Sequence, residues 1–241
     1  MKTLLWAEHQ KLKRSKVLWI AVFAVVMVSL TVFLQGQFTY YDKRYIDNAF
    51  WYMTAMQSLG GIYVFPAIIS LLGSYLICRE EQDDTLKSLY LIPVNLSDLI
   101  GVKLIMTGFF SVVLYVFLFT VTLVVEAGLH IHLLSAGRVL NFARIYILEG
   151  ICLFLAVSPV IAVTYRLKKG YWLSLIFAEI YSFLSLFIWQ SKLLFLYPIT
   201  AAFCVAGYYE TTPIQFIISM LSLLLCGAVS LMLLYRLYKR F

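Results

Sequence analysis

Acidic side chains make up most of the chemistry that this sequence offers. Glu80 and Glu81 stand side by side at the end of an apolar run, and the stretch from Arg79 to Lys103 is the longest strongly polar passage of the chain. Two adjacent carboxyl groups can divide the roles of general acid and general base. They can equally give a charged surface to a contact with another protein. The elements that carry them decide between these roles.

Hydrolysis within the membrane is the enzymatic function that such a pair would serve best. Glutamate-type intramembrane proteases have an arginine four residues after the second glutamate, and Thr85 occupies that position here. His130 and His132 fall in a segment that we expect on the opposite side of the membrane, with no third metal ligand near them. The chain also lacks the GxxxxGKS/T, HExxH, GxSxG and GxGxxG motifs. We therefore predict no catalytic site, no metal and no cofactor on this chain.

Three more glutamates lie in or near apolar runs, namely Glu126, Glu149 and Glu179. An ionisable group at membrane depth is expensive, so it faces the interior of a bundle, a water-filled path or a partner. Glu179 lies eight residues into its run, about 12 Å from the start at 1.5 Å per residue. It is either a group on a substrate path or a carboxyl that holds two helices together. Arg144 is about one turn from Glu149, which favours an ion pair and a structural role there.

Apolar runs dominate the chain. Of its 241 residues 63% are hydrophobic and 13% are charged, which excludes an ordinary soluble domain. A membrane-spanning helix needs about 20 predominantly apolar residues, and runs that do not alternate exclude a β-barrel. We therefore predict an all-α integral membrane protein with one domain over residues 17–241. Its six transmembrane helices are expected at 17–35, 59–78, 102–125, 145–165, 171–188 and 214–235.

The distribution of Lys and Arg gives the orientation, because cytoplasmic segments carry the excess of positive charge. With both termini in the cytoplasm, the inner segments hold fourteen of the 19 Lys and Arg residues and the outer segments hold five. We therefore expect a multi-pass protein of the cell membrane with both ends inside. The net charge of +7 then reflects topology, so membrane lipid and not nucleic acid is the expected partner.

Two shorter segments complete the predicted fold. Residues 1–16 mix leucines with basic side chains and are expected to form an amphipathic helix along the inner membrane surface. No small-x-small cleavage site follows the first apolar run, so we expect that run to be retained. The stretch 193–207 has 15 residues with Pro198 inside, too few to cross. We expect it to enter the outer leaflet and return.

Past the membrane, the helical pattern continues from Glu80. An apolar face is formed by residues at i, i+3, i+4 and i+7, which are Leu86, Leu89, Tyr90 and Pro93. The other faces carry acidic residues, among them Glu80, Glu81 and Asp84. A simple connection between two helices would need only a few residues, and this segment is longer. Because the segment also keeps one face apolar, a docking surface is favoured over a solvated loop. The partner should offer an apolar groove with basic surroundings.

These residues carry a resemblance to a known family. Glu81, Thr85–Leu86, Leu91–Pro93 and Lys103 together are similar to the coupling segment of type-2 ABC exporter permeases. The N-terminal pattern also resembles the opening interfacial helix of that family, with Glu8, Lys11 and RSKVLW at 14–19. Chain length, six spans and the short segment between the fifth and sixth spans agree with the family over essentially the whole chain.

The resemblance implies a permease subunit that works with other chains. Its partners would be a second permease copy or a sister permease, and two separately encoded subunits that bind ATP and Mg. Residues that couple to those subunits would be Glu80, Glu81, Asp84, Thr85, Leu86, Leu89, Tyr90 and Pro93. Polar residues of the substrate path would be Glu126, Glu149 and Glu179.

Within the family, chains of this size resemble the bacitracin and lantibiotic self-protection permeases. Export or clearance of a hydrophobic or peptide antibiotic is therefore expected, and the acidic membrane residues would suit a cationic amphipathic substrate. Two other functions stay open, the intramembrane protease and a stand-alone channel, receptor or immunity protein. A nucleotide-binding partner would favour the permease, and function without any such partner would favour the stand-alone protein.

Overall fold

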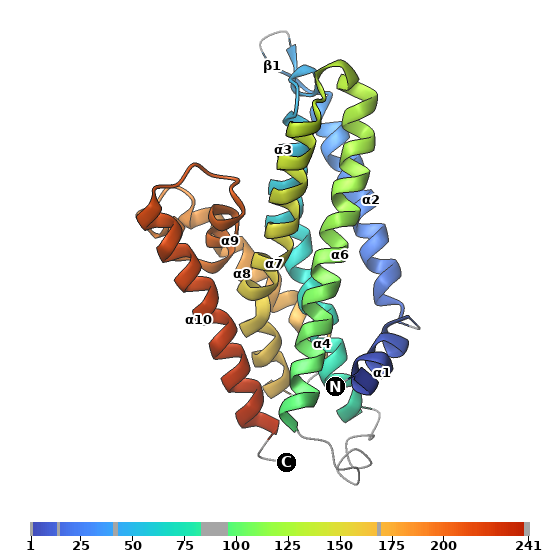
Figure 1. The fold of residues 1–241 in the computed structure, drawn as a ribbon, viewed down its shortest axis with the longest axis vertical. Coiled ribbons are helices and arrows are strands. Elements are labelled where there is room, and N and C mark those ends of the chain that lie inside the picture. The colour runs from blue at the N-terminus through green and yellow to red at the C-terminus, as the bar shows by residue number, and fades with distance from the viewer. Residues whose placement is uncertain (1, 14, 41–42, 83–95, 168–169, 239–241) are drawn as a thin grey trace.

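The computed structural model describes residues 2–13, 15–40, 43–82, 96–167 and 170–238, and nearly all of them lie in helices (Figure 1). Within these ranges the strands are a two-residue antiparallel pair, β1 (Thr39–Tyr40) and β2 (Lys43–Arg44). The fold is therefore all-α, as the composition predicts. We call the two ends of the bundle the α1 end and the β1 end, after the elements that lie there in Figure 1.

Five stretches of the described chain are helical, long and apolar enough to cross a membrane. Four of them belong to α2 (Val17–Gly36), α6 (Leu96–His130), α7 (Ala136–Leu167) and α10 (Pro213–Tyr238). The fifth, Trp51–Arg79, runs through α3 (Trp51–Leu59), η2 (Gly60–Val64) and α4 (Phe65–Gln82). Helix α8 (Leu173–Ile188) is equally apolar but has only 16 residues.

Helices α6 and α7 are longer than the apolar runs at their centres. They have 35 and 32 residues, which correspond to about 50 Å at 1.5 Å per residue, against a hydrocarbon core of about 30 Å. They continue through polar residues toward the β1 end, where η3 (Ile131–Leu133) joins them (Figure 1). A hydropathy pattern detects only the part of a helix whose side chains suit lipid. The backbone hydrogen bonds of the helix continue into the polar residues beyond that part, so the helix is longer than the predicted span. The predicted span 102–125 therefore covers only the middle of α6, and the predicted span 145–165 leaves out the start of α7.

The second span begins earlier than the sequence indicates, because a wide helical turn joins α3 to α4. Residues Gly60–Val64 form a π-helix, which is uncommon and is often found at functional sites. Phe50, directly before α3, has a φ of 65° and is the one non-glycine residue with positive φ in the described chain. The short helix η1 (Tyr45–Asp47) precedes Phe50 in the sequence. The polar residues of α3 hide this extension from a hydropathy reading.

Between α8 and α10 the chain forms two short helices, η4 (Lys192–Phe195) and α9 (Pro198–Ala206). Pro198 occupies the first position of α9, where its missing N–H costs no hydrogen bond. Gly207 ends the helix with a φ of 89°, which a side chain would strain. Helix α9 is largely buried against α7 and α10, so it packs within the protein.

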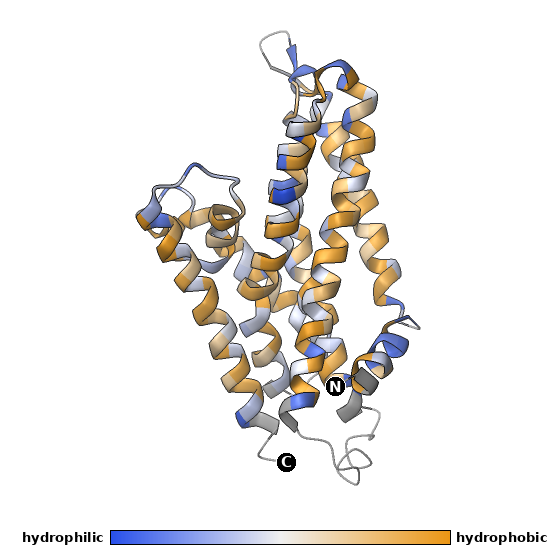
Figure 2. Cartoon of the chain, in the orientation of Figure 1, coloured by the Kyte–Doolittle hydropathy of each residue, from blue (hydrophilic) through white to orange (hydrophobic). Residues whose placement is uncertain are grey.

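The core lies around α7, which contacts α4, α6, α9 and α10. Leu153, Ala156 and Val157 of α7 are fully buried in it. Large apolar side chains remain exposed on the outward faces of α2, α8 and α10. Figure 2, in which each residue is coloured by its hydropathy, shows that hydrophobic residues predominate along the helices. The fold thus carries hydrophobic residues inside and outside, as lipid requires.

At the α1 end, three parts of the chain come together. Helix α1 (Lys2–Lys13) lies across the end of α4 and the start of α6, and the last turns of α10 lie at the same end (Figure 1). Leu4 of α1 packs against an apolar cluster that includes Ile77 of α4 and Ile100 of α6. The polar passage of the sequence leaves and re-enters the bundle at this place.

Candidate functional site

The residues predicted to couple to a partner lie mostly outside the described residues. Glu80 and Glu81 belong to the last turn of α4. The others fall in the range 83–95, namely Asp84, Thr85, Leu86, Leu89, Tyr90 and Pro93. The structure therefore describes the two helices that flank this segment, and the docking helix itself stays a prediction.

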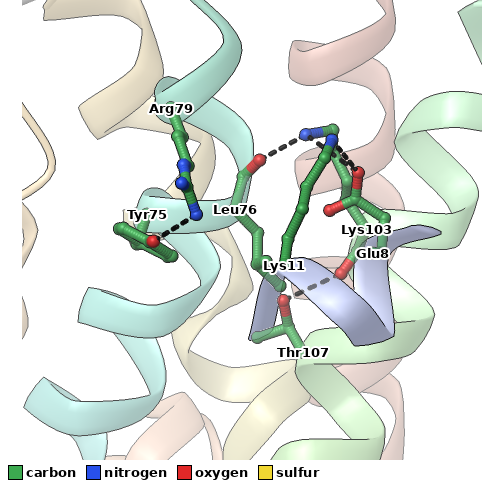
Figure 3. Close-up of polar contacts among 7 residues, drawn as sticks. All are labelled: Glu8, Lys11, Tyr75, Leu76, Arg79, Lys103 and Thr107. Atoms are coloured by element: carbon green, nitrogen blue, oxygen red, sulfur yellow. Dashed lines mark hydrogen bonds and ion pairs between the residues drawn. The ribbon is translucent and has the colours of Figure 1, made fainter. Parts of the chain in front are cut away.

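Lys103 is the centre of a polar cluster at the α1 end (Figure 3). It lies about two turns into α6, its side chain is completely buried, and its ammonium group donates to the backbone carbonyl of Leu76 in α4. The hydroxyl of Thr107 donates to the Lys103 carbonyl at 2.9 Å. Lys103 is one of the fourteen Lys and Arg residues counted above for the inner segments, and its side chain points between α4 and α6 (Figure 3).

Glu8 of α1 supplies the negative charge of this cluster. Its side chain is 3% exposed, and its Oε1 lies 4.0 Å from Nζ of Lys103 and 2.7 Å from Nζ of Lys11. The other oxygen, Oε2, is buried and has no hydrogen-bond partner among the described residues. A buried ammonium group needs such a carboxylate, because desolvation of an unpaired charge is costly. We call Glu8, Lys11, Lys103 and the Leu76 carbonyl the Lys103 cluster.

The Lys103 cluster fixes both flanks of the polar passage. The bond from Lys103 to Leu76 crosses from α6 to α4, and apolar contacts of Ile77, Leu99 and Ile100 surround it. Nearby, Arg79 donates to the hydroxyl of Tyr75 at 2.6 Å and lies over its ring (Figure 3). The two helices that flank the polar passage are thus joined by the bond from Lys103 to Leu76.

A second polar cluster lies deeper in the bundle, around Glu149 of α7. Gln57 of α3 donates to Oε2 at 3.1 Å and Tyr115 of α6 donates to Oε1 at 3.2 Å, and all three side chains are buried. The predicted pairing of Glu149 with Arg144 is wrong, because these neutral donors satisfy the carboxyl group. Tyr115 is twelve residues beyond Lys103 on α6, or about 18 Å along the helix.

The π-helix lets the chain approach this carboxyl group closely. A Cβ atom on Gly61 would lie 2.5 Å from Oε1 of Glu149 and 2.6 Å from the ring of Phe203. A π-turn also weakens the regular backbone bonding, and Ser182 of α8 donates to the carbonyl of Ile62 there. Helices α3, α6, α7, α8 and α9 therefore meet around one polar point inside an apolar bundle.

Glu126 lies at the β1 end, where it caps another helix. Its Oε1 accepts from the backbone N–H of Phe50 at 2.9 Å, just before α3 begins, and lies 2.9 Å from Nδ1 of His130. From Lys103 to Glu126 is about 35 Å along α6. The pair His130 and Glu126 is therefore remote from Glu80 and Glu81, which removes the histidine that a protease would need beside them.

Glu179 is half-buried on α8 and has no hydrogen bond or ion pair to another described residue. Its neighbours Ile176, Ile180 and Phe183 are exposed, by 54%, 56% and 48%. The opposite face of α8 is buried and carries Ser174, Ser182 and Ser185. Glu126, Glu149 and Glu179 thus lie in three separate environments and form no single site in this chain.

The surface formed by the described helices is hollowed in places, and two of these hollows have volumes that would suit a small molecule. One, of about 530 Å³, lies between α2, α3, η2 and α8, and its lining includes Gln35, Ser58, Tyr63 and Trp189. The other, of about 510 Å³, lies between α6, α7 and α10 and is lined almost entirely by apolar side chains. The first hollow offers both polar and aromatic groups, as sites for amphipathic molecules do.

A family model described as "ABC-2 family transporter protein" matches residues 4–185, from α1 to the last turn of α8. The chain belongs to the ABC-2 family of transporters. A relative, the "Bacitracin transport permease protein BCRB" of Bacillus licheniformis, is 29% identical over 140 residues, which are 58% of this chain and 67% of that protein. The protein is therefore the transmembrane subunit of an ABC transporter, in the multi-pass form that its apolar helices indicate.

Family membership also assigns the chemistry to other chains. ABC-2 permeases work with separate ATP-binding subunits, which use ATP and Mg, and they often form dimers. In the part of the permease that the structure describes, no group of three His, Cys, Asp or Glu side chains is arranged for a metal ion.

Four residues of these clusters lay outside the predicted sites. Glu8 and Lys103 belong to the motifs that resemble the family, but the sequence alone assigned no role to them. Nothing in the sequence around Gln57 and Tyr115 indicated that they would bind Glu149. One sign was available for Lys103. It stands inside the apolar run LIGVKLIMTGFF, where a charge needs a partner.

Proposed function

We propose that the permease exports or clears a hydrophobic or peptide antibiotic, with bacitracin as the first candidate. The observation that carries this proposal is its similarity to a protein named as a bacitracin transport permease. Two ATP-binding subunits and a second permease copy or a sister permease would complete the transporter. ATP-driven closure of those subunits would move residues 80–93 and switch the permease between inward and outward access.

Six spans and cytoplasmic termini are part of this proposal. Helix α8, counted as the fifth span, would cover about 24 Å with its 16 residues, and Trp172 and Trp189 at its two ends suit the membrane interfaces. An even number of spans agrees with α1 and the end of α10 lying at one end of the bundle (Figure 1). Helix α1 would lie along the inner surface, and 193–207 would re-enter from outside.

The docking helix would use the acidic and apolar faces predicted above. Glu80 and Glu81 continue α4 toward the cytoplasm, and the apolar face around Leu86 and Leu89 would enter a groove of the ATP-binding subunit. The flanks of this segment are joined to one another, since Lys103 of α6 donates to Leu76 of α4. A push on the docking helix would therefore reach both spans together.

Substrate would enter the bundle near α8. The hollow between α2, η2 and α8 combines Gln35, Ser58 and Trp189, which suits a molecule with polar and apolar parts. Glu179 lies on the exposed face of the same helix. A carboxyl group facing lipid is expensive, so that face would meet the second permease or the substrate. The carboxyl group of Glu149 is already bonded to Gln57 and Tyr115, so we assign it to the bundle interior.

A growth assay tests this function. A bacitracin-sensitive bacterium that makes the permease with its ATP-binding subunits should tolerate more bacitracin than one that makes either alone. Glu179→Gln keeps the size of the side chain and removes its charge, and it should weaken substrate contact by roughly tenfold. Glu210→Gln, an exposed residue beyond α9, is the matched control and should leave tolerance unchanged. Equal tolerance without ATP-binding subunits would support the stand-alone immunity protein.

A further inference from the structure

We propose that the hollow between α2, α3, η2 and α8 continues along α8 to Glu179 as one binding site, and that its ligand is an amphipathic molecule with a protonated amine. The amine meets the carboxyl group of Glu179, and the rest of the molecule fills the hollow. The inference rests on the proposed function, because it names the class of substrate that the transporter would move.

Glu179 lies on the side of α8 that faces the hollow. Leu186 of the same helix lines the hollow, and Glu179 precedes it by seven residues. At 3.6 residues per turn, seven residues fall only about 20° short of two full turns, and they cover about 10 Å along the axis. The two side chains therefore leave α8 on the same side, two turns apart.

Phe183 connects these two positions. It lies about one turn from each, and its ring meets the ring of Tyr63 edge-on, with 5.6 Å between the ring centroids. Tyr63 lines the hollow from η2, and the two aromatic residues are exposed by 48% and 36%. An ammonium group is attracted to the faces of such rings. The route from the hollow to Glu179 therefore suits a cation.

A hydrogen bond from α8 to η2 fixes one wall of this site. Pro66 has no N–H group to offer the carbonyl of Ile62, four residues before it. The hydroxyl of Ser182 in α8 donates to that carbonyl. Ile62 also lines the hollow, so the same bond holds α8 and the hollow in register.

Glu179 supplies the charge that selects the ligand. It has no hydrogen bond or ion pair to another described residue, and a carboxyl group at membrane depth needs a partner. A second copy that docks through the same face of α8 offers no cation, because Leu173–Ile188 contains no lysine, arginine or histidine. An amine on the ligand does supply this charge.

The hollow suits the other parts of an amphipathic molecule. Its volume is about 530 Å³, which is within the usual range of ligand sites, roughly 300–1,000 Å³. The amide of Gln35 and the hydroxyl of Ser58 can each donate and accept a hydrogen bond, and Trp189 and Leu186 add apolar surface. A peptide with an apolar portion and a basic side chain offers matching groups.

Two matched probes test the site by their binding to the purified permease. N-decanoyl-lysine amide carries a protonated amine, and its Nε-acetyl form is neutral and otherwise alike. The permease is held in phosphatidylcholine nanodiscs, and the saturable binding of each probe is measured by equilibrium dialysis, with empty nanodiscs as the background. The wild type should bind the cationic probe about tenfold more tightly than the neutral one.

Variants assign this preference to residues. Glu179→Gln should remove it, so that both probes bind about equally, whereas Glu179→Asp keeps the carboxyl group and should keep the preference. Glu210→Gln, at an exposed position beyond α9, is the control and should bind as wild type. Leu186→Trp fills the hollow and should weaken the binding of both probes by tenfold or more. If Leu186→Trp does not insert, Ala55→Leu replaces it, with the same expected result.

Three results would overturn the inference. These are a preference for the cationic probe that survives in Glu179→Gln, binding of both probes that Leu186→Trp or Ala55→Leu leaves unchanged, and no saturable binding to the wild type. None of them bears on the proposed function, because the probes are bound here without ATP-binding subunits. Bacitracin tolerance that does not depend on those subunits would instead remove the proposed function, and the amine site would remain as measured.

Discussion

Leu86→Asp combined with Leu89→Asp should detach the ATP-binding subunits from the permease while the chain still inserts into the membrane. Both leucines lie outside the described residues, on the apolar face that the sequence predicts for the docking helix. Leucines that anchor a helix in a groove contribute about 2 kcal/mol each, so losing two should weaken association roughly a thousandfold. Co-purification in mild detergent measures this directly.

A charge added elsewhere on the same segment is the control. Ser88→Asp lies between the two leucines in sequence and falls off the predicted apolar face, so the subunits should remain bound. If the double variant keeps its ATP-binding subunits, the apolar face predicted for the docking helix does not bind them. If Ser88→Asp loses them as well, net charge and not the apolar face governs the contact.

Gly61→Val should destabilise the bundle at the Glu149 cluster. The added side chain would meet Oε1 of Glu149 and the ring of Phe203 at distances that real Cβ atoms essentially never show. Forcing extra methyl groups into a packed interior costs about 1–3 kcal/mol, and displacing the carboxyl group from Gln57 and Tyr115 adds to this. A lower midpoint of thermal unfolding in detergent is the expected result.

Gly137→Val is its matched control. Gly137 also lies in a helix, at the β1 end of α7, but a Cβ atom there meets nothing within 4 Å. Its unfolding midpoint should stay close to that of the wild type. If the two variants unfold alike, the close approach at η2 has no energetic importance.

The sequence predicts the spanning elements well, because lipid imposes a length and a composition that can be read from one residue to the next. The centres of α2, α6, α7 and α10 fall inside the predicted runs. The extension of the second span through α3 and η2 was missed. Its signal is the pair Gly60–Gly61, whose use depends on side chains from α7 and α9.

The polar clusters could not be predicted, because they join residues far apart in the chain. Glu8 and Lys103 are separated by the first two spans, and Gln57 and Glu149 by the third. Each residue taken alone reads as a surface charge, a loop amide or a candidate substrate group. Only the packing of α1 on α6, and of α3 on α7, gives each of them its partner.

The proposed function requires that this chain moves a substrate only with ATP-binding subunits. Proteoliposomes that hold the permease with those subunits test it by the movement of bacitracin with and without ATP. We predict movement that requires ATP and the subunits, and that is lost in the Leu86→Asp and Leu89→Asp double variant. Equal movement by the chain alone, with no nucleotide, would contradict the permease function and identify a channel.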